Sequence, residues 1–153
     1  MRLLTITATC LLTALTPSKS FGLDLDRLTE AVGQVETGMR HDAVGDYMSA
    51  RGAWQMHQGA WKEASARVDK SIARESWFFG AVNPAVSRAY AKAYLSILAD
   101  KLRTLYRRDP TPAEVYAAYR RGYGEFSRQG GDLSSLSRSV LDSCRRVENI
   151  YRK

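Results

Sequence analysis

The stretch NPAVSRAYAKAYLSILADKLRTL, residues 83–105, carries the clearest helical pattern of the chain and decides the fold. Asn83 is a favoured N-cap, and Pro84 a favoured first residue of a helix. Apolar side chains then recur in two adjacent stripes that cover half of the circumference. The stripes are Val86, Tyr90, Tyr94 and Ile97, and Ala91, Leu95, Leu98 and Leu102. The pattern predicts a central, buried helix that is contacted on two sides.

Further helix signals lie on both sides of this segment. Between Asp24 and Thr37, one apolar stripe consists of Leu25, Leu28, Val32 and Val35, and Gly38 supplies a left-handed stop. A shorter helical pattern covers residues 58–68. The sequence Thr111-Pro112-Ala113-Glu114 is a capping box, and Gly122 ends the helix that it opens. These signals predict that helices make up most of the chain.

Other segments complete the prediction of a mainly α single domain over residues 21–153. Residues 39–53 contain Gly45, Asp46, Ser49 and Gly52 and predict a loop or a small hairpin after the first helix. The run Trp77-Phe78-Phe79 is expected in the core. After Gly130-Gly131, Asp132 is predicted to cap a last helix, and Cys144 on its apolar stripe is expected to be a buried, inert thiol.

The N-terminus has the three parts of a secretory signal. Met1-Arg2 precedes the charge-free run from Leu3 to Thr16, and small residues follow at Ser18 and Ser20. The run is too short for a lasting membrane anchor, which needs about 20 apolar residues. We therefore expect residues 1–20 to be a signal peptide, and the rest to be exported to the periplasm or the outside of the cell without a stable membrane anchor.

The expected mature chain is basic and holds a single cysteine. Loss of Arg2 and Lys19 leaves 21 of the 23 basic residues against 16 acidic ones, and Cys10 is lost as well. No intramolecular disulfide is then possible, so stability must come from packing. The positive charge either attracts anionic cell-wall or membrane surfaces or only aids solubility. A nucleic-acid binder is not expected, because the basic residues are spread over many elements and the chain carries an export signal.

Glu36 is the candidate for acid chemistry. At about 100° per residue it lies about 20° around the helix from Leu25, within the apolar stripe and at the helix C-terminus. Desolvation and the negative end of the helix dipole would both raise its pKa, as a general acid requires. The alternative is a surface glutamate at a fraying helix end.

Three blocks resemble the lysozyme-like superfamily, most closely its branch of lytic transglycosylases and goose-type lysozymes. Members of that branch show Glu-Ser, then Gly-Leu-Met-Gln, then Ala-Tyr-Asn-x-Gly. The corresponding blocks here are Glu36-Thr37-Gly38, Gly52-Ala53-Trp54-Gln55-Met56 and Ala118-Tyr119-Arg120-Arg121-Gly122. The central helix resembles the long helix of the family, so the likeness covers nearly all of residues 25–125.

The resemblance implies an exported enzyme that cleaves the glycosidic bond between N-acetylmuramic acid and N-acetylglucosamine in peptidoglycan. Glu36 would be its catalytic acid, with Thr37, Trp54, Gln55 and Tyr119 as substrate-binding residues; Tyr119 could equally be a core residue. Trp54 would offer an indole platform to a sugar ring. Arg120 stands where the family has Asn, which puts substrate contacts in doubt and supports an alternative, a lysozyme-like protein that binds cell-wall glycan without cutting it.

Two chemistries remain open for Glu36. In lytic transglycosylases a hydroxyl of the sugar itself attacks, and one carboxyl group suffices; in a hydrolysing lysozyme water attacks, and a second carboxylate normally helps. Asp46, ten residues after Glu36, is the candidate for that second catalytic group, with a plain turn residue as the alternative. His57 either rims the cleft or is simply solvated. We expect no cofactor, no metal site and a monomer.

Overall fold

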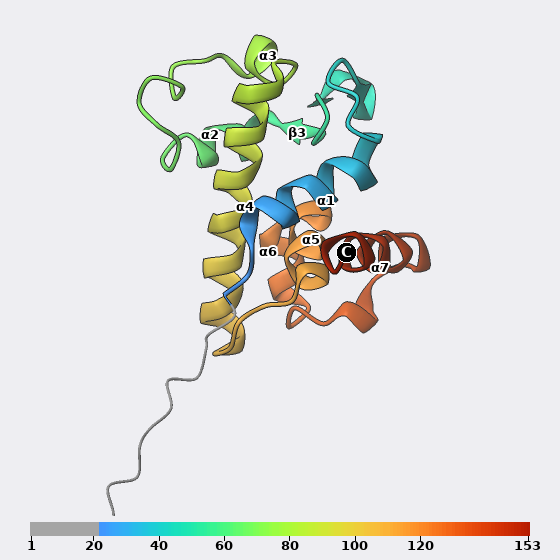
Figure 1. Ribbon diagram of the computed structural model, residues 1–153. Coiled ribbons are helices and arrows are strands. Elements are labelled where there is room, and N and C mark those ends of the chain that lie inside the picture. The colour runs from blue at the N-terminus through green and yellow to red at the C-terminus, as the bar shows by residue number, and fades with distance from the viewer. Residues whose placement is uncertain (1–21) are drawn as a thin grey trace, which may run out of the picture.

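The computed structural model, which describes residues 22–153, is built around helix α4 (Pro84–Tyr106). Asn83 caps this helix: its side-chain oxygen accepts hydrogen bonds of 3.1 Å from the backbone N–H groups of Ala85 and Val86. Figure 1 shows α4 running through the height of the molecule, with other helices on either side. Its buried side chains include Tyr90, Leu95, Leu98 and Leu102. The predicted central, buried helix is confirmed.

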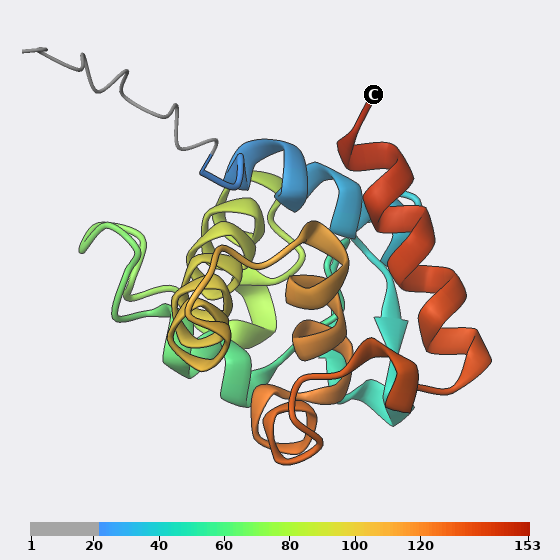
Figure 2. The same ribbon diagram turned by 90° about the horizontal axis from the view of Figure 1, so that it is seen from below.

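The remaining elements surround α4 and make the described chain mainly helical, as predicted. In chain order they are α1 (Leu25–Thr37), β1 (Val44–Gly45), the 3-10 turn η1 (Asp46–Met48), β2 (Ala50–Arg51), β3 (Met56–His57), α2 (Gln58–Ala64), α3 (Trp77–Gly80), α5 (Pro112–Arg121), α6 (Tyr123–Arg128), the 3-10 turn η2 (Leu133–Ser135) and α7 (Arg138–Tyr151). Helix α4 contacts α1, α2 and α5. Seen from below in Figure 2, α5 lies between α4 and α7.

Helix α1 begins and ends at the predicted residues. The carboxylate of Asp24 accepts hydrogen bonds of 3.0 Å from the backbone N–H groups of Asp26 and Arg27. Gly38 adopts a left-handed conformation with φ of 65°, and its N–H bonds to the carbonyl of Gln34. This ending directs the chain away from α1 and into the small sheet.

The segment after α1 forms a three-stranded antiparallel sheet in the order β1-β2-β3. Val44 pairs with Arg51 and Ala50 pairs with His57, so the register is set by two tight connections. The prediction of a loop or a small hairpin is confirmed. The sheet lies at the end of α1 (Figure 1), which brings η1 and β3 close to the last turn of that helix.

Helix α5 also follows its predicted caps, whereas the last helix begins later than expected. Thr111 and Glu114 form the reciprocal capping box at the start of α5, and Gly122 stands at its end. Asp132, however, caps only the turn η2, and α7 starts at Arg138. Cys144 is buried as predicted, and desolvation raises the pKa of its thiol to about 11.

Two predictions about the middle of the chain are wrong. Helix α2 ends at Ala64, before the predicted end of its pattern at Val68. Phe78 and Phe79 are 48% and 69% exposed, although an apolar run was expected in the core. Helix α3 has only four residues, so it cannot bury all of its aromatic side chains, and only Trp77 packs against the core.

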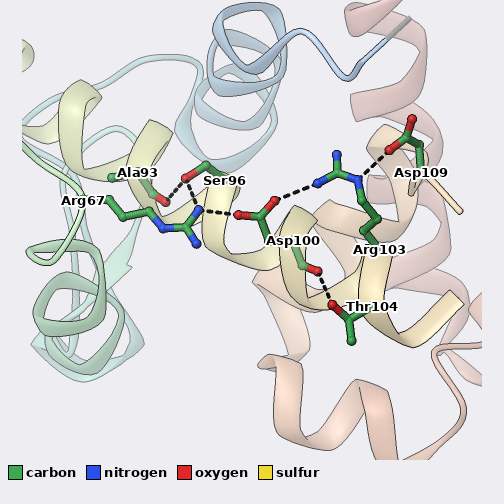
Figure 3. Close-up of polar contacts among 7 residues, drawn as sticks. All are labelled: Arg67, Ala93, Ser96, Asp100, Arg103, Thr104 and Asp109. Atoms are coloured by element: carbon green, nitrogen blue, oxygen red, sulfur yellow. Dashed lines mark hydrogen bonds and ion pairs between the residues drawn. The ribbon is translucent and has the colours of Figure 1, made fainter. Parts of the chain in front are cut away.

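A chain of polar contacts ties the solvent face of α4 to the loops beside it (Figure 3). The carboxylate of Asp100 accepts a hydrogen bond of 2.6 Å from Arg67 and one of 2.7 Å from Arg103. Arg103 also donates to Asp109 at 2.7 Å. These groups are about half exposed, so each pair contributes at most about 1 kcal/mol to stability. The network fixes the loops and leaves the opposite side of α4 for the core.

No helix within residues 22–153 has the length and apolar character needed to cross a membrane. The expected signal peptide, residues 1–20, and Cys10 lie outside the described residues.

Candidate functional site

The side chain of Glu36 lies at the end of α1 and is only 5% exposed. Leu28 and Val32, on the same apolar stripe, are fully buried, and the stripe carries Glu36 inward with them. Helix α1 stops two residues later at Gly38. A carboxyl group is thus held at a helix end, against the core, as predicted.

Two side chains of α5 meet the carboxyl group of Glu36. The hydroxyl of Tyr116 donates a hydrogen bond of 2.8 Å to Oε1. Nη1 of Arg120 lies 3.7 Å from Oε2, which is an ion pair but is too long for a hydrogen bond. Tyr116 and Arg120 are four residues apart on one helix, so both point from the same face of α5.

Burial decides the protonation of Glu36. Desolvation raises its pKa above the ordinary value of 4.5, and the charge of Asp46 acts in the same direction. The hydrogen bond from Tyr116 and the charge of Arg120 oppose this by favouring the carboxylate, but the pKa remains raised. Glu36 therefore has the property that a general acid needs, a proton retained closer to neutral pH.

Glu36 forms part of the wall of a cavity of about 280 Å³. The cavity lies where the end of α1, the small sheet and the last turn of α5 meet. Its polar lining includes Glu36, Asp46, Gln55, His57, Tyr119 and Arg120. The structure thus brings together four of the six residues that the sequence analysis proposed for the site, namely Glu36, Asp46, Gln55 and Tyr119.

Asp46 supplies a second carboxylate to the cavity from the turn η1. It is 62% exposed and lies 3.2 Å from Nε2 of His57, which is charged when protonated. Asp46, Tyr47 and Met48 all have positive φ, at 47°, 52° and 76°. Such a conformation is costly for residues other than glycine, and strained residues of this kind cluster at functional sites. His57 both rims the cavity and is half exposed, so the two interpretations of this residue hold together.

Gln55 lines the cavity, but its side-chain N–H groups donate hydrogen bonds to backbone carbonyls. The side-chain nitrogen donates to the carbonyl of Gly52 at 2.9 Å and to that of Ala43 at 3.3 Å. The amide oxygen of Gln55 lies close to Gly45, so a side chain at position 45 would displace it. Gln55 therefore holds the sheet together, and its carbonyl oxygen is the group left for a ligand.

Trp54 and Thr37 do not line the cavity, contrary to expectation. Trp54 is 1% exposed, and its indole N–H donates to the carbonyl of Thr29 at 2.8 Å. Its indole is enclosed in the hydrophobic core, so a sugar ring has no access to its face. The hydroxyl of Thr37 donates to the carbonyl of Ala53 at 2.8 Å and accepts from the N–H of Arg40 at 3.0 Å. Both residues attach α1 to the sheet.

Tyr119 combines the two roles considered for it. It lines the cavity, and its hydroxyl donates a hydrogen bond to the backbone carbonyl of Trp54. Burial and the nearby charge of Glu36 raise the pKa of its hydroxyl, which therefore stays protonated. Tyr119 joins α5 to the turn between β2 and β3 and lines the same cavity as Glu36.

Tyr116 makes the closest polar contact with Glu36 and was not among the residues predicted for the site. A signal for it was present, because Tyr116 lies three and four residues before Tyr119 and Arg120, a spacing that places all three on one face of a helix. The contact itself joins residues 80 positions apart, and no local pattern reports it.

Within residues 22–153, no three His, Cys, Asp or Glu side chains are grouped in a way that could hold a metal ion. The chain matches no protein-family model, no curated protein and no solved structure.

Proposed function

We propose that this protein cleaves the glycan strands of peptidoglycan with Glu36 as its general acid, on a lysozyme-like fold. The observation that carries the proposal is the placement of Glu36: a desolvated carboxyl group with a raised pKa, in the wall of a cavity that also holds a second carboxylate. The resemblance of the Glu36, Gln55 and Tyr119 blocks to the lysozyme-like superfamily supplies the substrate, a bond between N-acetylmuramic acid and N-acetylglucosamine.

Glu36 would protonate the glycosidic oxygen of the bond that breaks. The bond between the anomeric carbon and that oxygen then cleaves through a transition state with oxocarbenium character. The resulting carboxylate is stabilised by the hydroxyl of Tyr116, and it can serve as the base for the second step. In that step either a hydroxyl of the same sugar or a water molecule attacks the anomeric carbon and loses its proton to Glu36.

The two forms of this reaction differ in whether they use the carboxylate of Asp46. This carboxylate lies in the same cavity as Glu36, where it could orient an attacking water or stabilise positive charge on the sugar. Ring closure by the sugar's own hydroxyl requires no second carboxylate. The product therefore identifies the role of Asp46.

The test is digestion of purified peptidoglycan, followed by mass analysis of the new sugar ends. Ends that lack one water would indicate ring closure, and ordinary reducing ends would indicate hydrolysis. The variant Glu36→Gln keeps the shape of the side chain and should lower the rate by about 10² to 10⁴ fold. Glu30→Gln is the matched control, because Glu30 is exposed on the same helix. Equal rates for wild type and Glu36→Gln would overturn the assignment.

One observation favours a second function, the binding of cell-wall glycan without cleavage. Arg120 lies beside Glu36 and stabilises its ionised form, which opposes its use as an acid. This alternative predicts that the wild-type protein sediments with insoluble peptidoglycan and releases no soluble fragments.

A further inference from the structure

Arg120 places a guanidinium group in the wall of the cavity. The proposed acid chemistry does not need this group. The Arg120 side chain is 45% exposed, and it lines the cavity from the last turn of α5. A neutral sugar offers no charge to such a group. An arginine at this point therefore calls for an anionic partner other than Glu36 alone.

The contact between Arg120 and Glu36 leaves the guanidinium largely unused. At 3.7 Å the pair gains from charge attraction but forms no hydrogen bond. Among the hydrogen bonds of residues 22–153, none has the Arg120 side chain as donor, so its five N–H groups are available. The neighbouring Arg121 also lines the cavity, but it is paired with Glu125 in the next helix.

A guanidinium group with free N–H groups is suited to anions with paired oxygens, which are carboxylates and phosphates. Of these two, the glycan of the proposed function offers carboxylates next to the bond that breaks. The planar fork of the guanidinium matches the two oxygens of a carboxylate, and such bidentate pairs are among the strongest hydrogen-bonded contacts in proteins. Lysine or asparagine would not provide this geometry. The ligand of Arg120 is thus best described as a carboxylate that enters the cavity beside Glu36.

We propose that Arg120 binds a carboxylate carried by the glycan next to the scissile bond, and that this contact draws Arg120 away from Glu36. The inference rests on the proposed function and narrows its substrate to an acidic glycan. Two carboxylates of peptidoglycan have this chemistry: the lactyl group of N-acetylmuramic acid, which is free only after the stem peptide has been removed, and the carboxylates of the stem peptide itself.

Withdrawal of Arg120 would make Glu36 a better acid at the moment when substrate is bound. Arg120 lowers the pKa of Glu36 in the free protein, so its departure raises that pKa. The other ionisable groups around the cavity stay in place; they are Tyr116, Tyr119 and Arg121 of α5, Tyr94 of α4, Asp46 of η1 and His57 of β3. A neutral glycan would leave Arg120 beside Glu36, and the pKa of Glu36 would stay lower than with an acidic glycan.

The test measures binding of small ligands by NMR titration, without need for turnover. The disaccharide of N-acetylglucosamine and N-acetylmuramic acid has a free lactyl carboxylate and lacks the bond to be cleaved. Its lactyl amide is the neutral match, and the disaccharide bearing a stem peptide is the second carboxylate source. Wild-type protein should bind a carboxylate ligand about tenfold more tightly than the amide.

Variants assign this preference to Arg120. Arg120→Gln should abolish it, whereas Arg145→Gln should retain it, because Arg145 is an exposed arginine of α7 outside the cavity. Preference for the free disaccharide would identify the lactyl carboxylate, and preference only for the peptide-bearing form would identify the stem peptide. Equal binding of all three ligands by wild type, or an unchanged preference in Arg120→Gln, would overturn the proposal.

The same titrations follow the carboxyl carbon of Glu36. Its pKa should rise when the carboxylate ligand binds to wild type, should stay constant with the amide, and should already be higher in ligand-free Arg120→Gln. A constant pKa with every ligand would contradict the displacement. Cleavage of peptidoglycan together with equal binding would leave the proposed function intact and remove only the role of Arg120, whereas absence of both cleavage and glycan binding would remove both.

Discussion

The hydroxyl of Tyr116 donates a 2.8 Å hydrogen bond to Oε1 of Glu36, across 80 residues of sequence. A donor stabilises a carboxylate more than a carboxylic acid, so this bond lowers the pKa of Glu36 against the larger effect of burial. The two residues together set how much of Glu36 is protonated at a given pH.

Tyr116→Phe should raise the pKa of Glu36. A general acid loses activity as the pH rises through its pKa, and the high-pH limb of kcat/KM reports that pKa in the free enzyme. The limb should therefore move to higher pH. The variant also leaves a buried carboxyl group without its donor, which should lower the free energy of unfolding by about 1–3 kcal/mol. Tyr106→Phe is the control, because the hydroxyl of Tyr106 bonds to Gly131 instead. A high-pH limb that stays in place would contradict this account.

The burial of Glu36 should also be visible in the pH dependence of stability. Because folding raises its pKa above 4.5, the native state binds more protons than the unfolded state at pH values between the two pKa values. The contribution of Glu36 to stability is therefore greatest below 4.5 and falls as the pH rises through the folded-state pKa.

Glu36→Gln removes this titration, so its stability relative to wild type should increase as the pH rises from about 4 to 8. Urea unfolding at several pH values measures the difference. The same measurement on Glu30→Gln should show no such trend, since Glu30 is exposed. A constant difference between Glu36→Gln and wild type would mean that folding does not raise the pKa of Glu36.

The long helices of this protein could be predicted because their signals are local. Asn83 with Pro84, and Thr111 with Glu114, satisfy backbone groups within one turn, and their effect does not depend on the rest of the fold. The apolar stripe of α1 likewise indicated that Glu36 faces inward. These features are decided by residues three or four positions apart.

Short elements could not be predicted in the same way. The turn between β2 and β3 shows no periodicity, so nothing in the sequence indicated that Trp54 faces the core while Gln55 faces the cavity. Phe78 and Phe79 are exposed because α3 is only one turn long. In such segments the rest of the fold decides which side is buried, and hydrophobicity alone is a poor guide.

Trp54→Phe tests the corrected role of the tryptophan. Loss of the bond from the indole N–H to the carbonyl of Thr29, with some loss of packing, should reduce the free energy of unfolding by about 1–3 kcal/mol. Binding to insoluble peptidoglycan, measured by sedimentation where the variant is fully folded, should be unchanged because Trp54 does not line the cavity. Weaker binding with an unchanged free energy of unfolding would instead indicate that Trp54 is a platform for a sugar ring, as the sequence suggested.

Asp46→Asn tests whether the second carboxylate takes part in the reaction. Asp46 is mainly exposed, so the substitution should change the free energy of unfolding by less than about 0.5 kcal/mol, and any loss of rate can be assigned to chemistry. If wild-type protein cleaves peptidoglycan to products with reducing ends, we expect the rate to fall by about 10² fold or more, because water then lacks the group that orients it. If the products lack one water, the rate should remain nearly unchanged, since the sugar supplies its own nucleophile. His57→Gln is the control for the ion pair. It removes the imidazole that lies 3.2 Å from the carboxylate of Asp46 but keeps the negative charge of Asp46. If the products lack one water and Asp46→Asn still loses much of the rate, ring closure with Glu36 as the single carboxylate would be contradicted.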